Sequence, residues 1–289
     1  MDRAICDFTE AIRLKPDYAE AYYNRGDVYV GKGDLDKAIA DYNIAIRLKP
    51  DHAGAYYIRG AVYASKGEMD RAICDFTEAI RLKPDHAEAY YKRGAVYVSK
   101  GEMDRAIADY TEAIRLKPDD AEAYCNRGAV YASKGDLDKA IADYTQESLL
   151  KLAKECYDQG IAYHNEGDTD KAIDGYTGAI QMKPDWAEAY YKRGLAYGCT
   201  GDLDKAIADC TEAIRLKPDW AEAYYYRGVA YEDKGDLDKA IADCNIAIRL
   251  KPDYAEAYYS RGLAYHSKGD RSKADADFAK AKDLGYEPD

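Results

Sequence analysis

Residues 19–52 of the chain read AEAYYNRGDVYVGKGDLDKAIADYNIAIRLKPDH, and this stretch returns with small changes along nearly the whole sequence. The tripeptide Lys-Pro-Asp marks the period, and its prolines are Pro16, Pro50, Pro84, Pro118, Pro184, Pro218 and Pro252. Successive prolines lie 34 residues apart, except for one step of 66. A fixed period of this length predicts a solenoid of stacked supersecondary units, each burying its apolar side against its neighbours.

Each repeat contains the start and stop signals of two helices. Asp17 precedes an uninterrupted run and forms a capping-box pattern with Glu20, so we expect helix A over about residues 19–32. Gly33 suits the left-handed end of that helix. Asp34 is then the cap of helix B, which runs to about residue 49 before Pro50. The Asp–Glu spacing recurs at Asp85/Glu88, Asp119/Glu122, Asp185/Glu188, Asp219/Glu222 and Asp253/Glu256.

Small and aromatic residues alternate on the facing sides of the two helices. The pattern consists of Tyr22, Gly26, Tyr29, Ala38, Tyr42, Ala45 and Pro50. It resembles the tetratricopeptide repeat (TPR), and full repeats begin at Ala19, Ala53, Ala87, Ala121, Ala153, Ala187, Ala221 and Ala255. Residues 1–18 correspond to a lone helix B. The resemblance implies an all-α, right-handed α-solenoid of antiparallel helix pairs, whose helix A faces line a concave groove that binds peptide segments of partner proteins.

Composition narrows the classes of partner. The net charge of −12 argues against nucleic acid or an anionic membrane. No apolar run approaches the roughly 18 residues of a membrane span, and no signal peptide is recognisable at the start of the sequence. The seven cysteines fall at different phases of the repeat without any CxxC, so we interpret them as reduced thiols of a cytoplasmic protein.

The candidate binding residues lie on helix A. We expect the first tyrosine of the helix, such as Tyr22, to be buried and the next one to point into the groove; neighbouring positions vary between repeats. The peptide-binding candidates are Tyr23, Asn24, Tyr57, Tyr91, Lys92, Asn126, Tyr157, Asp158, Ile161, Tyr191, Lys192, Leu195, Tyr225, Tyr226, Val229, Tyr259 and Leu263. Tyrosine provides contact area and a hydroxyl at little entropic cost. Alternatively, each ring packs against neighbouring helices and only shapes the wall; for the whole ladder we favour binding.

One departure from the family pattern predicts ion pairs. Arginine stands just before the helix A glycine, and aspartate stands just before the core residue of helix B. Repeat five lacks both, with Gln159 and Gly175 in their places. Because the two residues disappear together, we expect pairs within a repeat, such as Arg25–Asp41 and Arg59–Asp75. The alternative is that these charges are solvated separately.

The step of 66 residues interrupts the array near residues 145–155. Residues 138–165 contain no proline and a single glycine, Gly160, and Lys151 occupies the cap site. We expect helix B of repeat four to continue into helix A of repeat five as one long helix, with two arrays at residues 1–146 and 147–289. The alternative is a tighter turn centred on Ser148.

Catalytic patterns are missing from the sequence. The four histidines have no nucleophile partner at a recognisable spacing, and no metal or cofactor motif is complete. We therefore expect a non-enzymatic scaffold that binds a protein or peptide partner and needs no cofactor. Two alternatives remain open. One is a module that forms homodimers through the uncovered N-terminal helix or through residues 138–165, and the other is a regulatory TPR segment of a larger enzyme.

Overall fold

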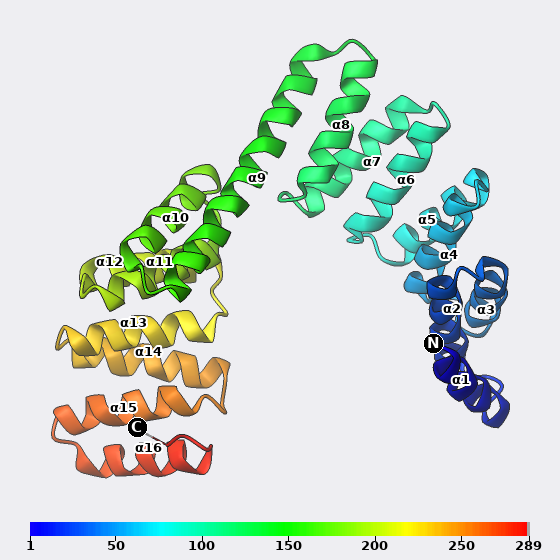
Figure 1. The fold of residues 1–289 in the computed structure, drawn as a ribbon. Coiled ribbons are helices and arrows are strands. Elements are labelled where there is room, and N and C mark those ends of the chain that lie inside the picture. The colour runs from blue at the N-terminus through cyan, green and yellow to red at the C-terminus, as the bar shows by residue number, and fades with distance from the viewer. Residues whose placement is uncertain (288–289) are drawn as a thin grey trace. The chain divides into compact units, whose positions relative to one another are not determined.

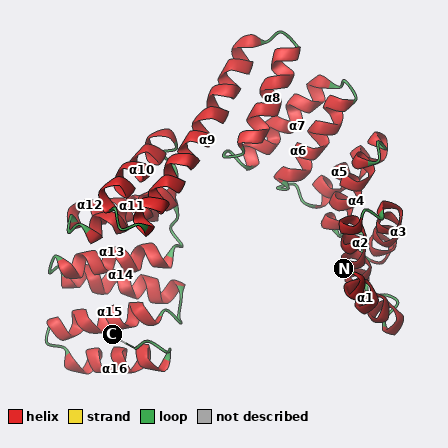
Figure 2. Ribbon diagram, viewed as in Figure 1, coloured by secondary structure: helices red, strands yellow, loops and turns green. Residues whose placement is uncertain are grey.

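The computed structural model describes residues 1–287, which form sixteen α-helices and no strand (Figures 1 and 2). The helices are α1 (Asp2–Leu14), α2 (Ala19–Lys32), α3 (Leu35–Leu48), α4 (Ala53–Ser65), α5 (Met69–Leu82), α6 (Ala87–Ser99), α7 (Met103–Leu116), α8 (Ala121–Ser133), α9 (Leu137–Asn165), α10 (Thr169–Met182), α11 (Ala187–Cys199), α12 (Leu203–Leu216), α13 (Ala221–Asp233), α14 (Leu237–Leu250), α15 (Ala255–Ser267) and α16 (Arg271–Asp283). The architecture is an α-solenoid of helix pairs, as the period predicted.

The helix boundaries follow from glycine and from the Lys-Pro-Asp turn. Gly33 has φ 78°, the left-handed conformation that ends α2. The predicted cap at Asp17 is wrong by one residue, because Tyr18 is the N-cap of α2 and makes no side-chain capping bond. The backbone N–H of Tyr18 donates to the carbonyl of Lys15, so Asp17 belongs to the preceding turn. The capping-box interpretation therefore fails; the N-cap positions are Tyr18, His52, His86, Asp120, Trp186, Trp220 and Tyr254.

The chain divides into two compact units, residues 1–148 and 149–289. We call them unit 1 and unit 2 and describe each by itself. Within each unit, consecutive helices pack side by side, so that every helix pair lies against the next (Figure 1). The long helix α9 covers the 66-residue step without a turn, which confirms the predicted long helix and excludes a turn at Ser148.

The core of a repeat forms where helix A and helix B approach closely. The ring of Tyr42 is fully buried beneath Gly26, and a Cβ atom on this glycine would lie 2.7 Å from the ring. Ala38 and Ala45 are also fully buried beside the ring. The same arrangement recurs with Phe76 beneath Gly60. Small residues thus allow close helix contact while one ring fills the remaining volume.

The predicted ion pairs within a repeat are present. Arg25 donates from Nε and Nη2 to both carboxylate oxygens of Asp41, each over 2.8 Å, and Arg59 forms the same fork with Asp75 over 2.7 Å. Nη1 of Arg25 also reaches Oγ1 of Thr9 in the preceding helix B, at 3.0 Å. Each arginine therefore joins the two helices of its own repeat and links them to the repeat before.

Candidate functional site

In unit 1, the tyrosines predicted to line the groove are half-buried between two other rings. Tyr23 lies 5.9 Å from Tyr42 and stacks on His52 at 4.8 Å, measured between ring centroids. Tyr57 lies at the same two distances from Phe76 and His86. In the next repeat, Asp120 replaces the second ring. There the hydroxyl of Tyr91 accepts a hydrogen bond from Nδ2 of Asn126 at 2.7 Å.

In unit 2, tryptophan and tyrosine replace the histidines of this arrangement. Tyr157 stacks on Trp186, and Tyr191 lies tilted against Trp220, each pair with its ring centroids 4.5 Å apart. Tyr225 lies 5.0 Å from Tyr254, and its pKa is raised to about 12, mainly by burial. Burial likewise raises the pKa of Tyr191, whose ring is only 8% exposed. These phenols stay neutral at physiological pH and can donate or accept hydrogen bonds.

The prediction that the first tyrosine of helix A is buried and the next one points into the groove is therefore wrong for the first tyrosine. Tyr22 and Tyr23 are both half-buried, and the guanidinium of Arg25 lies 5.7 Å from the Tyr22 ring centroid. Tyr23 and its equivalents instead form part of an interlocked row of rings. A tyrosine ladder in this form is partly a structural wall, and only its uncovered edges are available for a ligand.

The variable positions beside the ladder differ in exposure. Asn24, Lys92 and Asp158 are exposed, and Tyr226 is 37% exposed. Lys154 forms an ion pair with Asp158 at 2.7 Å. Half-buried candidates are Asn126, Ile161, Lys192, Leu195, Val229 and Leu263. Exposed and half-buried positions together leave room for both polar and apolar contacts.

Three of the candidates come together around one cavity of unit 2. Leu195, Tyr226 and Val229 line a volume of about 360 Å³, with the thiol of Cys210 in its wall. The remaining lining residues are His164, Gly194, Gly198, Cys199, Leu203, Ala206, Ala230 and Asp233. Cys210 occupies the position that Tyr42 and Tyr110 hold in unit 1, so a thiol replaces a ring beneath the helix A glycine.

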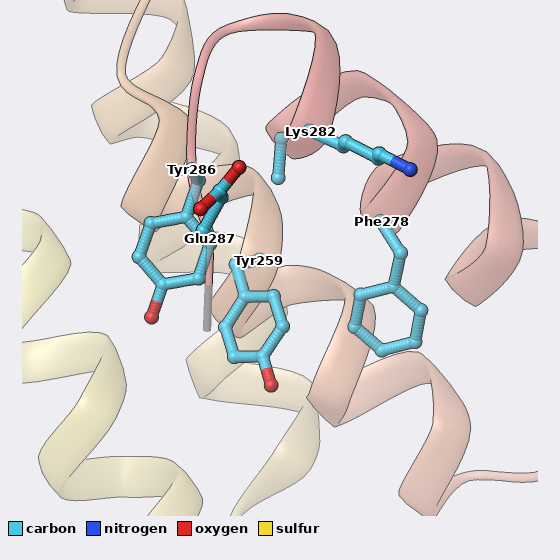
Figure 3. A pocket seen from close by; sticks show the side chains of 6 residues that line it. Tyr259, Phe278, Lys282, Tyr286 and Glu287 are labelled. Atoms are coloured by element: carbon cyan, nitrogen blue, oxygen red, sulfur yellow. The ribbon is translucent and has the colours of Figure 1, made fainter. Parts of the chain in front are cut away.

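A second cavity, of about 430 Å³, lies in the last repeat of unit 2 (Figure 3). Tyr259 and Phe278 line it together with Ala281, Lys282, Tyr286 and Glu287. The ring of Tyr286 lies tilted against that of Tyr259 with the centroids 4.7 Å apart, and the close-up shows the two rings side by side. Tyr286 thus has the role that Trp220 has for Tyr191.

The sequence interpretation missed the residues that precede each helix A. His52, His86, Trp186, Trp220 and Tyr254 all contribute a ring to the row. The signal was present, because the residue after each Lys-Pro-Asp is tyrosine, tryptophan or histidine except before Ala121, where it is Asp120; the repeat that begins at Ala153 has no Lys-Pro-Asp.

Within residues 1–287, no group of three metal-binding side chains is close enough to hold an ion. No helix in the described part of the chain combines the length and apolar character of a membrane span.

Comparison with known proteins agrees with this geometry. A family model described as TPR repeat matches residues 1–33, 26–67, 60–101, 94–135, 160–198 and 231–269. Two models described as tetratricopeptide repeat match residues 187–219 and 255–284. No curated protein matches the chain.

Several solved structures are similar. The crystal structure of MamA is 28% identical, with 66% of this chain and 93% of that chain covered and a TM-score of 0.41. The first TPR of Spaghetti (RPAP3), bound to an HSP90 peptide, is 26% identical over 41% of this chain and 94% of that chain, with a TM-score of 0.41. The Arabidopsis OM64 TPR domain is 26% identical over 40% and 97%, with a TM-score of 0.40. Because the family models match well over half of the residues, this chain belongs to the tetratricopeptide repeat family.

Proposed function

We propose that this chain is a non-catalytic scaffold that binds a peptide segment of a partner protein along its helix A faces, with the main seat in unit 2. Membership of the TPR family supports the general role of a protein-interaction scaffold. We further propose that residues 1–146 and 147–289 act as two arrays, of which the second carries the main site.

The cavity beside Cys210 is the observation that carries this proposal. Its volume of about 360 Å³ is bounded by Leu195, Val229 and Tyr226, which come from adjacent helices α11 and α13. Apolar walls with few polar groups favour a large apolar side chain as the occupant. Burying such a side chain contributes about 1.5–3 kcal/mol, enough to fix the register of an otherwise weakly bound segment.

Charge favours a segment with basic residues beside the apolar one. The chain carries a net charge of −12, and exposed Asp233 stands at the edge of the cavity. The neighbouring Glu232 is partly buried, which raises its pKa, and the charge of Asp233 adds to the shift. A lysine or arginine close to these carboxylates would favour their ionised form.

A substitution that the chain itself uses elsewhere tests the proposal. Cys210→Tyr introduces the ring that Tyr42 supplies in unit 1, beneath the glycine that already faces this position, so the repeat should still fold. Cys244→Tyr makes the same exchange one repeat later, outside the cavity lining, and is the matched control. A phage-displayed random peptide library is selected on the full chain, and Kd values of the enriched peptides are measured by calorimetry.

We expect enriched peptides with an aromatic or long aliphatic residue next to Lys or Arg. Their affinity should fall at least about tenfold on Cys210→Tyr and remain within about twofold on Cys244→Tyr. A library without enrichment, or equal Kd values for the wild type and Cys210→Tyr, would remove the basis of the proposal. The cytoplasmic location, the homodimer and the regulatory segment of a larger enzyme remain predictions.

A further inference from the structure

The last helix B face of unit 1 is apolar and open. It lies on residues 137–148 of α9, where the exposed fractions are 62% for Leu137, 63% for Ile141 and 37% for Tyr144. The equivalent rings of earlier repeats, Tyr42 and Tyr110, are at most 2% exposed. We call the surface of Leu137, Asp138, Ile141, Tyr144 and Thr145 the open face.

Earlier repeats of unit 1 show what covers such a face. A valine from the next helix A packs on the preceding core ring, as Val62 does on Tyr42. Val96 with Phe76 and Val130 with Tyr110 repeat this contact. The tyrosine after the valine packs in the same cluster as the isoleucine of the preceding helix B, as the clusters of Tyr63 with Ile39 and of Tyr97 with Ile73 show.

Hydrogen bonds and ion pairs between consecutive repeats recur in the same way as these apolar contacts. Nη1 of Arg93 donates to Oγ1 of Thr77 at 2.9 Å, and Nη1 of Arg127 donates to Oγ1 of Thr111 at 3.0 Å. The lysine that ends each helix A pairs with an aspartate in the first turn of the preceding helix B. The pairs in unit 1 are Lys32–Asp2, Lys66–Asp36, Lys100–Asp70 and Lys134–Asp104.

A single sequence pattern therefore covers these faces, Arg-x-x-Val-Tyr-x-x-Lys. It reads RGDVYVGK at residues 25–32, RGAVYASK at 59–66, RGAVYVSK at 93–100 and RGAVYASK at 127–134. The open face keeps both acceptors for this pattern, since Thr145 corresponds to Thr111 and Asp138 to Asp104. Asp138 is exposed, and it has no cationic partner in the described part of the chain.

The helix A that follows in the chain does not fit the open face. Residues 159–166 read QGIAYHNE, with Gln159 and Glu166 where arginine and lysine stand elsewhere. Glu166 would bring a carboxylate to Asp138 instead of an ammonium group. In addition, α9 has no turn that could return its second half against its first. A second copy of the chain offers the same mismatched helix, and its matching helices α2, α4, α6 and α8 already cover their own neighbours.

We propose that the open face binds an amphipathic helix of another protein that carries the pattern Arg-x-x-Val-Tyr-x-x-Lys. The valine and tyrosine of this helix cover Tyr144 and Ile141. Its arginine reaches the hydroxyl of Thr145 and its lysine reaches Asp138. This surface is in unit 1 and is independent of the cavity beside Cys210, so either proposal can fail without the other.

A peptide from the chain itself is the sharpest probe. Residues 87–101, AEAYYKRGAVYVSKG, are synthesised with a lactam bridge between Glu88 and Lys92, which are both exposed in α6. The control peptide carries Arg93→Gln and Lys100→Glu, the residues found at the equivalent places of repeat five. Fluorescence anisotropy then measures the binding of each peptide to the full chain.

We expect the first peptide to bind at least about fivefold more tightly than the control, because two polar contacts are lost in the control. Ile141→Asp in the full chain should weaken the first peptide at least about tenfold. Leu14→Asp, at a leucine of α1 that is 70% exposed, should leave its affinity unchanged. Circular dichroism verifies that both variants keep the helix content of the wild type.

Three results would overturn the proposal. The first is that neither peptide binds, or that both bind equally. The second is that Ile141→Asp keeps wild-type affinity. The third is a dimer of the wild type in light scattering that Ile141→Asp converts to a monomer, because a second copy would then occupy the open face.

Discussion

Units 1 and 2 share one repeat but fill its core differently. In unit 1 the residue beneath each helix A glycine is aromatic, as at Tyr42 and Phe76, whereas unit 2 has Cys210 and Cys244 in two of its repeats. Unit 2 also has tryptophan before two of its helices, where unit 1 has tyrosine, histidine or aspartate. Compared with unit 1, unit 2 therefore has smaller side chains in the helix B core of two repeats and larger rings in the loops before two of its helices.

The cavity beside Cys210 is the physical consequence of this exchange. A thiol fills far less volume than a phenol, and the surrounding helices are held at their spacing by the contacts of the repeat. The comparison teaches that one framework can produce a filled wall or a hollow one by changing a single residue type per repeat. Framework and binding surface can therefore be altered separately.

The largest effect is expected from breaking an ion pair of the framework in unit 1. Asp75 is 6% exposed and accepts both hydrogen bonds of Arg59. Asp75→Ala leaves Nε and Nη2 of Arg59 without their acceptors, while Nη1 keeps its hydrogen bond to Oδ1 of Asn43. Removing the carboxylate from a buried pair costs about 3–5 kcal/mol of unfolding free energy. Urea denaturation followed by circular dichroism measures this loss.

Repeat five of unit 2, which lacks both charges, suggests a double variant to compare with Asp75→Ala. The double variant Arg59→Gln, Asp75→Gly copies Gln159 and Gly175, so it removes both charges together. It should cost less than Asp75→Ala alone, although glycine inside a helix costs about 1 kcal/mol. A double variant that loses more than the single variant would show that the charges stabilise the repeat in their own right.

The framework could be predicted from sequence to a large extent. Gly33 and Pro50 predicted the ends of the helices, because glycine readily adopts the left-handed conformation that ends a helix and proline restricts the residue before it to extended conformations. The pairing of Arg25 with Asp41 was predictable because repeat five lacks both residues. The missing signals at residues 138–165 likewise predicted the long helix α9.

The binding surface could be predicted much less well. His52 and Trp186 were passed over because the cap was assigned to the aspartate before each of them and the next residue was not considered as a packing partner. The cavity beside Cys210 depends on the difference between the volumes of a thiol and a ring, and on residues from four helices, α9, α11, α12 and α13. A one-dimensional pattern does not contain that information.

Glycine-to-alanine substitutions should lower the unfolding free energy more in unit 1 than in unit 2. The difference should be smaller than the loss expected from Asp75→Ala. At Gly26 a Cβ atom would lie 2.7 Å from the Tyr42 ring, whereas at Gly228 the nearest atom would be 3.3 Å away. Overpacking costs about 1–3 kcal/mol, and alanine regains about 1 kcal/mol of helix propensity. We expect Gly26→Ala to lower the unfolding free energy by about 1–2 kcal/mol.

Gly228→Ala, in contrast, should change the unfolding free energy by less than about 0.5 kcal/mol or raise it. Urea denaturation of both variants and of the wild type provides the measurement. Equal losses at the two positions would mean that the thiol-containing repeats of unit 2 are packed as tightly as the ring-containing repeats of unit 1.

The smallest effect concerns the lysine–aspartate contacts between repeats. Unit 1 has such a contact at Lys100–Asp70, whereas in unit 2 Thr200 stands where the lysine would face Asp170. Thr200→Lys should complete the series and raise the unfolding free energy by about 0.2–1 kcal/mol, since exposed pairs contribute little. The gain should shrink when the salt concentration rises to about 1 M, because screening weakens exposed charges. The reverse exchange, Lys234→Thr, removes the contact with Asp204 and should lose a similar amount. A gain that persists at high salt would come from the packing of the lysine stem and not from its charge.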